Sequence, residues 1–530
     1  MQNPGRLPYF KYVYKFKIIG LLLIAATLGG CAMVGPDFDL PPTELSDSWS
    51  EEAKEGLSTA VPEQADWWKA FNDPGLNLLI DEAYQQNLDL QMAGLRILEA
   101  RARLGIATGS LYPQQQRATA GFGATGASKN GANTLSADMR YTDSSVGFDA
   151  AWELDVWGKF RRGVQAADSQ LLATIADYDT VLVSLTGEVA RTYILIRTLE
   201  ERIRVAENNV IIQQRSLEIA ENRFDGGLVT ELDVQQARNL LASTQAVIPA
   251  LRASLRQAKN SLGVLLAVPS QQVNAMLSTS GEIPMAPTSI AVGIPAELLR
   301  RRPDVRQAEL RASAQSAMIG VAKADLYPHF TLIGSVGLRA SDSALTNTGG
   351  SDLGDIFSGD SVEYFGGPAI SWDIFNYGRI KNQVRVQDAR LQQLLVNYQN
   401  TVLNAAREVE DALTALLNNR RQLVYLDQAV NASQRSVDLA NLQYREGLVD
   451  FQRVLDTQRG LTNAQDRSTE VRGSVAMNMV AVFKALGGGW QIRDGKAFVP
   501  EKMRQQMAER TNWGDLLEET SETTSPDETN

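Results

Sequence analysis

The chain has 530 residues, 44% of them hydrophobic, and a formal net charge of −11, and no basic block suggests nucleic-acid binding. Its single cysteine, Cys31, excludes an intrachain disulfide. Its single histidine, His329, argues against histidine-based metal sites and His-dependent triads, and we expect an interfacial or structural role for it.

Residues 1–30 have the pattern of an export signal, in which three lysines precede a short apolar run from Ile18 to Leu28. Small residues then lead to Cys31, which resembles a bacterial lipobox and predicts a covalent lipid on this cysteine at the mature N-terminus. The alternative is an ordinary signal peptide with a chance cysteine. Ala32 follows where an inner-membrane retention signal would have aspartate, which favours the outer membrane.

Residues 31–66 are polar and rich in proline, so we expect a lipidated, extended tether. A first folded repeat is predicted at 67–283. It opens with Trp67 and Trp68, which we expect to pack in the core, and continues with two helices that end near Asn87 and Gly109.

The hydrophobic period then changes from about 3.6 residues to 2, which predicts strands. Apolar residues alternate with small or polar ones over 118–124 and again over 146–152. The segment 125–144 between them is rich in Gly, Ser, Asn and Thr, and we expect an exposed loop there.

A seven-residue ladder of apolar residues follows, which predicts one long helix over about 160–224 that packs along its length. The ladder consists of Ile175, Leu182, Val189, Ile196, Ile203, Val210, Leu217 and Phe224. At an offset of 220 the ladder recurs as Leu395, Val402, Val409, Leu416, Leu423, Val430, Val437 and Tyr444. A helix of about 65 residues is roughly 100 Å long. The chain is therefore predicted to be internally duplicated and to contain two very long helices.

The second repeat, predicted at 284–490, follows the plan of the first. Tyr327-Pro328 matches Tyr112-Pro113 at an offset of 215, and alternation over 330–338 predicts a strand. A polar loop is expected at roughly 340–360, and another strand approaches Trp372. Arg301, Arg302 and Asp304 are expected to cap a helix.

Each long helix is predicted to end in a tight turn followed by a returning helix, over about 231–266 and 451–486. The turn residues are Gly227, Leu228 and Val229 in the first repeat and Gly447, Leu448 and Val449 in the second. The glycines fit positions that need a left-handed backbone. The apolar residues are either contacts for a partner protein or simple hydrophobic capping contacts. Residues 491–530 form a tail whose acidic end, from 514, we expect to be disordered.

Four strands cannot close a membrane barrel alone, because the smallest known barrels use about eight. If these strands span a membrane, chains must associate, since open edges are not tolerated in lipid. A dimer gives eight strands and a trimer twelve, and twelve suits a usable lumen better. The alternative is that the strands form a soluble sandwich.

Six segments are the most distinctive in the chain. They are Val34-Gly35-Pro36-Asp37-Phe38, Asp66-Trp67-Trp68 with Phe71, Ile294-Pro295 through Leu298-Leu299, Arg301-Arg302-Pro303-Asp304-Val305, Leu326-Tyr327-Pro328, and Lys484-Ala485-Leu486-Gly487-Gly488-Gly489-Trp490. With the duplication, they resemble the TolC-like outer-membrane efflux factors, in the lipoprotein branch often called NodT-type. The resemblance implies an α+β membrane protein with a periplasmic helical barrel and a twelve-stranded trimeric β-barrel.

The resemblance also implies partners. It predicts a homotrimer in outer-membrane lipid that docks to a periplasmic adaptor protein, with the tip residues named above as adaptor contacts. It further predicts an energised inner-membrane transporter, commonly of the resistance-nodulation-division type. No cofactor is implied apart from the lipid on Cys31.

In this family the helical barrel narrows at its periplasmic tip, and the resemblance places Tyr444, Asp456 and Arg459 at that gate. Some members carry an aspartate where this chain has Arg453, so the chain departs from a two-ring acidic pattern. An acidic ring from three chains would attract cations. Without the resemblance, Asp456 and Arg459 form an ordinary surface pair three residues apart, worth a few tenths of a kcal/mol.

The expected function is the channel component of a tripartite efflux pump, a passive conduit for drugs or other small solutes. The alternatives are a protein-secretion conduit of a type I system and a non-conducting periplasmic structural lipoprotein. The sequence has no Gly-x-x-x-x-Gly-Lys-Ser/Thr phosphate loop, catalytic triad or zinc spacing, so we expect no enzyme.

Overall fold

The computed structural model describes residues 33–40, 49–50, 57–58, 65–128, 130, 140–277, 281–285, 287, 290–291, 301–342 and 352–518. The predicted signal at 1–30, Cys31 and the family segment at 294–299 lie outside the described residues. The chain divides into two compact units, which are described separately. The first comprises Met1–Pro41, Ala100–Leu172 and Leu310–Val396, and the second comprises Pro42–Glu99, Ala173–Glu309 and Asn397–Asn530.

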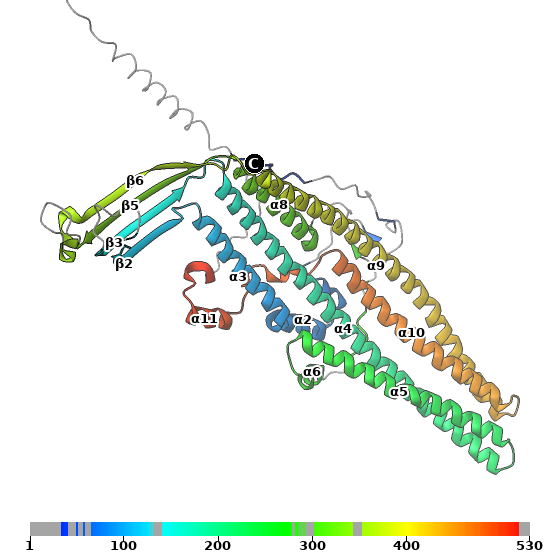
Figure 1. Cartoon of the computed structure of the whole chain (residues 1–530). Helices are drawn as coiled ribbons and strands as arrows, with labels where there is room; N and C mark the ends of the chain where they lie inside the picture. The colour runs from blue at the N-terminus through cyan, green and yellow to red at the C-terminus, as the bar shows by residue number, and fades with distance from the viewer. Residues whose placement is uncertain are drawn as a thin grey trace, which may run out of the picture. The chain divides into compact units, whose positions relative to one another are not determined.

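The first unit contains an antiparallel sheet of four strands in the order β2-β3-β5-β6, which lie side by side in Figure 1. The strands are β2 (Gln115–Gly126), β3 (Arg140–Glu153), β5 (His329–Ser341) and β6 (Val362–Ser371). Each repeat contributes one hairpin, and β3 joins the two hairpins by pairing with β5. Among the described residues, β2 and β6 are therefore the two edge strands of this sheet, each paired on one side only.

All four predicted strands are present, but they extend beyond the predicted segments. The polar loop expected at 125–144 is shorter, because β3 already begins at Arg140. In the second hairpin the short helices η2 (Leu353–Phe357) and η3 (Gly359–Ser361) precede β6.

One face of the sheet is apolar and exposed in the single chain. Residues that lie directly opposite in neighbouring strands point to the same face, and the registers place even-numbered residues together. The large exposed apolar side chains on this face are Phe122, Val146, Phe148, Trp152, Leu332, Val336, Val362, Tyr364 and Ile370. An exposed apolar face of this kind is typical of a surface that contacts another protein or a membrane.

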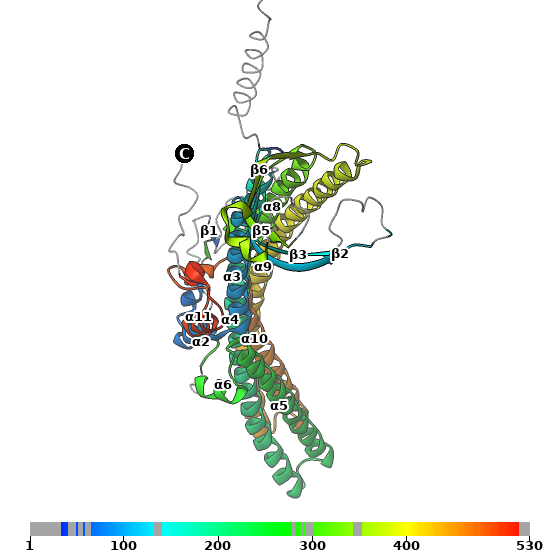
Figure 2. The same cartoon turned by 60° about the vertical axis from the view of Figure 1, so that its left-hand side comes forward.

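The two long helices, α4 (Lys159–Asp225) and α9 (Arg379–Arg445), each have 67 residues, which confirms the predicted duplication. They return as α5 (Glu231–Leu265) and α10 (Phe451–Ala485), each of 35 residues. In the second unit, α5 lies beside α4 and α10 beside α9 in both views (Figure 1, Figure 2). None of the described helices is both long and apolar enough to cross a membrane.

The predicted ladder residues supply much of the helix packing. In α4 the side chains of Leu182, Val189 and Ile196 are fully buried. In α9, Val409 and Leu416 are fully buried as well. Phe224, at the end of the first ladder, is instead 42% exposed, whereas Tyr444 at the same place in α9 is only 6% exposed.

The start of the first repeat forms a core in the second unit, with η1 (Trp67–Phe71), α2 (Pro74–Gln86) and α3 (Leu88–Gly109). Trp67 stacks on Phe483 with ring centroids 5.3 Å apart, and Trp68 is 2% exposed. The tryptophans therefore pack as predicted. The short helix α6 (Ser270–Met276) follows α5.

The described parts of the predicted tether contact folded elements. In the first unit, the backbone N–H of Val34 donates to the carbonyl of Trp157, and Arg162 forms an ion pair with Asp37 at 2.8 Å. In the second unit, β1 (Leu57–Ser58) pairs in parallel with β4 (Ile290–Ala291). The tether is thus docked at several points along its length.

Helix α8 (Pro303–Ala324) begins beside a buried arginine. Arg302 is 7% exposed, donates to the carbonyl of Ala485, and pairs with Asp304 and Glu408 at 2.8 Å. Burial opposes the Arg302 charge, but the two carboxylates outweigh burial and raise the pKa of this guanidinium. Arg302 thus has the structural role that we expected at the start of this helix.

The C-terminal residues fold further than predicted. After η4 (Trp490–Arg493) the chain forms α11 (Glu501–Arg510) and η5 (Gly514–Leu517). Leu517 packs against a small cluster of Leu98, Val499 and Met507. The prediction of disorder from residue 514 is therefore wrong for 514–517, because apolar residues in that stretch find a surface on α3.

Candidate functional site at the helix tips

Each long helix ends in the same hydrogen-bonded turn. Gly227 and Gly447 are left-handed, with φ of 70° and 74°. The N–H of Gly227 donates to the Phe224 carbonyl at 2.8 Å, and the N–H of Leu228 donates to the Arg223 carbonyl at 2.9 Å. The second turn repeats both bonds at the same positions. This is the Schellman arrangement, in which a side chain at the glycine position would strain the backbone.

The apolar residues of the two turns have different environments. Leu228 and Leu448 are 75% and 74% exposed, so neither closes its turn by packing. Val449 is partly buried and packs against the hydrophobic cluster beside it, which a residue just before a helix N-cap commonly does. The N-cap itself, Asp450, accepts from the N–H of Arg453 at 3.1 Å. In a single chain, the two leucines are therefore free to make contacts and Val449 is not.

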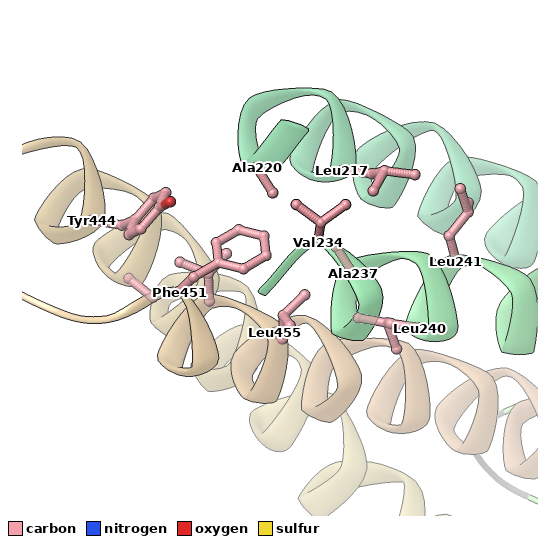
Figure 3. Close-up of a cluster of buried hydrophobic side chains, with 11 residues drawn as sticks. Leu217, Ala220, Val234, Ala237, Leu240, Leu241, Tyr444, Phe451 and Leu455 are labelled. Carbon is pink, nitrogen blue, oxygen red and sulfur yellow. The ribbon is translucent and has the colours of Figure 1, made fainter. Parts of the chain in front are cut away.

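A hydrophobic cluster, here called the tip cluster, joins the two helix hairpins behind the turns (Figure 3). It consists of Leu217, Ala220, Val234, Ala237, Leu240, Leu241, Ala440, Tyr444, Phe451, Val454 and Leu455. Since its members come from α4, α5, α9 and α10, the cluster packs the first repeat against the second.

Tyr444 belongs to this cluster and is only 6% exposed. Its ring lies 5.1 Å from the ring of Phe451, and the guanidinium carbon of Arg223 lies 4.3 Å from its centroid. Arg223 also donates to the Tyr444 carbonyl at 3.3 Å. The Tyr444 hydroxyl has no hydrogen-bond partner among the described residues. Arg223 thus ties the end of α4 to the end of α9.

Asp456 and Arg459 lie one turn apart on α10. The Arg459 guanidinium is 3.1 Å from Asp456, and both side chains are about half exposed. Gln452 also donates to Asp456 at 3.0 Å. Arg459 lines a hollow of about 320 Å³ between α4, α5 and α10, together with Arg202 and Asp466. In a single chain, Tyr444 is therefore buried while Asp456 and Arg459 form a surface pair.

Behind the tip cluster, α4 and α10 meet through hydrogen bonds. This polar seam consists of Asn209, Gln213 and Ser216 on α4 and Gln458, Thr462 and Gln465 on α10. The shortest of its bonds, from Gln458 Nε2 to Ser216 Oγ, is 2.7 Å. The side-chain oxygens of Gln213 and Gln458 are buried without a partner among the described residues.

The seam ends at a salt bridge. Arg202 on α4 holds Asp466 on α10 through two hydrogen bonds, at 2.8 and 3.0 Å. These bonds raise the pKa of Arg202, although partial burial opposes its charge.

Comparison with known proteins decides the family. The family model described as outer membrane efflux protein matches residues 79–268 and 294–488, which is most of the chain and one match per repeat. The chain belongs to the outer membrane efflux protein family. It is 35% identical to the pyoverdine export outer membrane protein OpmQ of Pseudomonas putida, over 82% of this chain and 89% of that one.

Two further proteins are similar to this efflux protein over nearly their whole length. The probable outer membrane lipoprotein SilC of Salmonella typhimurium is 30% identical, over 90% of this chain and all of that one. A solved structure of the outer-membrane channel OprN is 31% identical and has a TM-score of 0.80, covering 87% of this chain and all of that one. The predicted family and fold are confirmed. The efflux protein is an outer-membrane channel component of an efflux system.

The sequence did not reveal Arg223 or the polar seam as parts of the site. At the repeat offset of 220, Arg223 corresponds to Gln443, so the duplication gives no signal for a cation at this place. The seam depends on the register of α4 against α10, which are far apart in the sequence. Gln213 lies between Val210 and Leu217 of the apolar ladder, and the sequence gives no signal for its partner on α10.

Proposed function

We propose that three copies of this efflux protein form a passive conduit for drugs or other small solutes across the outer membrane. The observation that carries the proposal is the sheet, which has an exposed apolar face and two open edges. Unpaired backbone groups are costly in lipid, so the edges must be closed by other copies. Three copies supply twelve strands, enough for a lumen, whereas eight strands leave an interior that side chains nearly fill.

The conduit supplies no energy of its own in this proposal. An inner-membrane transporter, of the resistance-nodulation-division type, drives transport, and a periplasmic adaptor protein links it to the tips. A covalent lipid on Cys31 adds anchoring in the outer membrane. The mature chain needs no other prosthetic group.

The exposed leucines of the tip turns support the adaptor contact. Replacing both Leu228 and Leu448 with Ser should weaken adaptor binding without affecting folding, since both side chains are largely exposed. Leu403→Ser, at an exposed position along α9, is the matched control. Surface plasmon resonance with the purified adaptor is the measurement, and equal binding by the double variant and the control would contradict the assignment.

The gate is proposed at Tyr444, Asp456 and Arg459. Three copies of the exposed Asp456–Arg459 pair around one axis would place charges at the narrow end of the conduit. The buried Tyr444 would hold the tip in its narrow form through Arg223 and Phe451.

Single-channel conductance in planar bilayers tests both parts of the proposal. The native protein should give a small conductance, and Asp456→Ala should raise it sharply. The matched control is Asp411→Ala, which removes another exposed carboxylate of an intrahelical pair, 3.2 Å from Arg407 on α9.

Three results count against parts of the proposal. Equal conductance in the native and Asp456→Ala channels would support the proposed pore and contradict the proposed role of Asp456 in the gate. A rise of the same size in the control would show a general effect of charge. No conductance from inserted trimers would overturn the conduit.

A further inference from the structure

One large apolar side chain lies on the polar face of the sheet. Even-numbered residues form the apolar face described above, so the odd-numbered residues form the other face, which carries most of the charged groups. Of the large apolar side chains that are exposed on the described strands, only Phe365 has an odd number, and it is 61% exposed. In the proposed conduit the odd-numbered face lines the lumen, because the apolar face contacts lipid. A contact with lipid therefore does not explain Phe365.

Phe365 belongs to a row of four residues that crosses the whole sheet. The registers place Arg117 opposite Asp149 and Asp149 opposite Ser335. Ser335 in turn lies opposite Phe365. These four residues, here called the lumen row, present a guanidinium, a carboxylate, a hydroxyl and a ring in that order. Neighbouring strands are about 4.8 Å apart, so the row is roughly 14 Å long.

A hollow of about 330 Å³ lies along the lumen row, and all four residues of the row line it. Ala151 and Ile333 line it as well and give it an apolar part. These two residues lie opposite each other in the next odd-numbered pair, toward the strand ends that join the helices. The volume is at the lower end of the range for small-molecule sites, about 300–1,000 Å³. The hollow is therefore large enough for a small solute.

The charged groups of the lumen row are not joined to each other. Arg117 and Asp149 lie directly opposite and are both exposed, yet neither forms an ion pair among the described residues. Elsewhere on the same face Arg339 donates two hydrogen bonds to Asp143, at 3.0 and 3.2 Å. A cross-strand pair that only stabilised the sheet would be joined in this way. In the single chain, the guanidinium of Arg117 and the carboxylate of Asp149 are thus both available to a solute.

The order of groups in the lumen row determines which solutes fit it. A carboxylate attracts a cationic group, a guanidinium binds a carboxylate through paired N–H donors, and an aromatic ring packs against another ring. A solute that fills the row therefore has a ring at one end, a cationic group beside it and an anionic group at the far end. A dipeptide with an N-terminal aromatic residue has this order. Two extended residues span about 7 Å, which leaves room for the Phe365 and Arg117 side chains at either end.

We propose that the lumen row is a binding subsite for small zwitterionic solutes that carry an aromatic ring beside their cationic group. The ring of the solute packs on Phe365, and its cationic group lies between Asp149 and the Ser335 hydroxyl. Its anionic group contacts Arg117. The inference rests on the proposed conduit, which places the row in a lumen, and it adds a class of solute. Binding is weak, as a conduit requires, because a solute that binds tightly does not leave.

Binding of two dipeptides to the purified full-length protein in detergent tests the order of the groups. The probe is L-phenylalanyl-glycine. Its matched control is glycyl-L-phenylalanine, which has the same groups and net charge but carries the ring beside the carboxylate. Saturation-transfer NMR titrations should show at least roughly threefold tighter binding of the probe, since only the probe satisfies the ring and both charges together. Equal binding of the two dipeptides by the native protein would overturn the assigned order.

Removal of the ring tests whether the probe binds at this row. Phe365→Ala should weaken binding of L-phenylalanyl-glycine roughly threefold to tenfold, because it removes the stacking partner. The matched control is Tyr364→Ala, which removes an 84% exposed ring from the other face of the same strand and should leave the dissociation constant unchanged. Equal weakening by the two substitutions would contradict a site on the odd-numbered face.

Removal of the carboxylate tests the contact with the cationic group. Asp149→Asn should weaken binding of the probe roughly twofold to fivefold. It should not weaken binding of N-acetyl-L-phenylalanyl-glycine, which lacks the cationic group. Asp143→Asn, which changes a paired carboxylate on the same face, is the control and should leave both dissociation constants unchanged. If Asp149→Asn weakened both peptides equally, the assigned contact would be wrong.

Failure of the subsite can be separated from failure of the conduit. Channels that conduct in planar bilayers but bind the two dipeptides equally would overturn the subsite and leave the conduit intact. Protein that is inserted and does not conduct would overturn the conduit and, with it, the placement of the lumen row in a lumen.

Discussion

The tip cluster and the polar seam are neighbouring parts of the contact between the two repeats, but they are built from different interactions. The tip cluster consists of apolar residues and one tyrosine, and Leu455 and Val454 in it are each 1% exposed. The polar seam is almost as well buried, with Gln213 and Gln458 each 2% exposed, yet it relies on hydrogen bonds between side chains.

The difference predicts where the two hairpins hold together most strongly. Burying a large apolar side chain contributes a few kcal/mol, whereas a buried hydrogen bond contributes about 1 kcal/mol net. The seam also buries two side-chain oxygens without partners among the described residues, which subtracts from its stability. The turns should therefore stay together more firmly than the helices behind them.

The largest expected effect is in the tip cluster. Phe451→Ala should weaken the packing of the tip cluster by about 3–5 kcal/mol, because it removes a buried ring and leaves a cavity beside Tyr444. Hydrogen exchange of the tip amides measures this as a lower free energy of local opening. Leu448→Ala, at a residue 74% exposed in the adjacent turn, is the control and should change little. A loss under about 1 kcal/mol would mean that the cluster does not hold the tip.

A smaller effect is expected in the polar seam. Gln458→Ala should cost about 1–3 kcal/mol, because it removes the bond to Ser216 and leaves a gap. Gln458→Leu combined with Ser216→Ala replaces both partners by apolar groups and should change stability by less than about 1 kcal/mol. Hydrogen exchange of the α4 and α10 amides distinguishes the two variants. Equal losses from both would show that packing, not hydrogen bonding, stabilises the seam.

The smallest effect is expected at the surface pair. Asp456→Asn should change the free energy of unfolding by less than about 0.5 kcal/mol, since its partner Arg459 is also half exposed. Thermal unfolding followed by circular dichroism, beside Asp411→Asn, is the measurement. A clear loss of stability would mean that Asp456 has a structural role. A change in the conductance of the Asp456→Ala channel would then no longer identify Asp456 as part of a gate.

The long helices were predictable to within one residue at each end, and the ladder accounts for the C-terminal end, because its last residue, Phe224, lies next to the end of the helix. The predicted 160–224 became Lys159–Asp225, and the repeat offset then gave α9. The strands were recognisable by alternation, but their ends were not, since β3 continues into polar residues that the pattern assigned to a loop. Their pairing partners supply the hydrogen bonds that extend them.

The sequence predicted only those parts of the candidate site whose structure depends on a single short segment of the chain. Gly227 and Gly447 were recognisable because a left-handed turn depends on local backbone geometry. Tyr444 is buried, as a ladder position favours, but Phe224 at the same place in the first repeat is not, and the ladder gave no signal for the contact between Tyr444 and Arg223. Such contacts depend on how helices from different repeats pack, which the period of a single helix does not contain.

The equal lengths of corresponding helices limit which insertions and deletions the protein can tolerate. The pairs α4 and α9, and α5 and α10, match at 67 and 35 residues, while the loops within the two strand hairpins differ in length. Deleting one residue within a helix rotates everything beyond it by about 100° and moves its apolar ladder off the packing surface. Insertions and deletions in descendants of this gene should thus survive in the strand loops, and in the helices only as whole heptads matched between both helices of a hairpin.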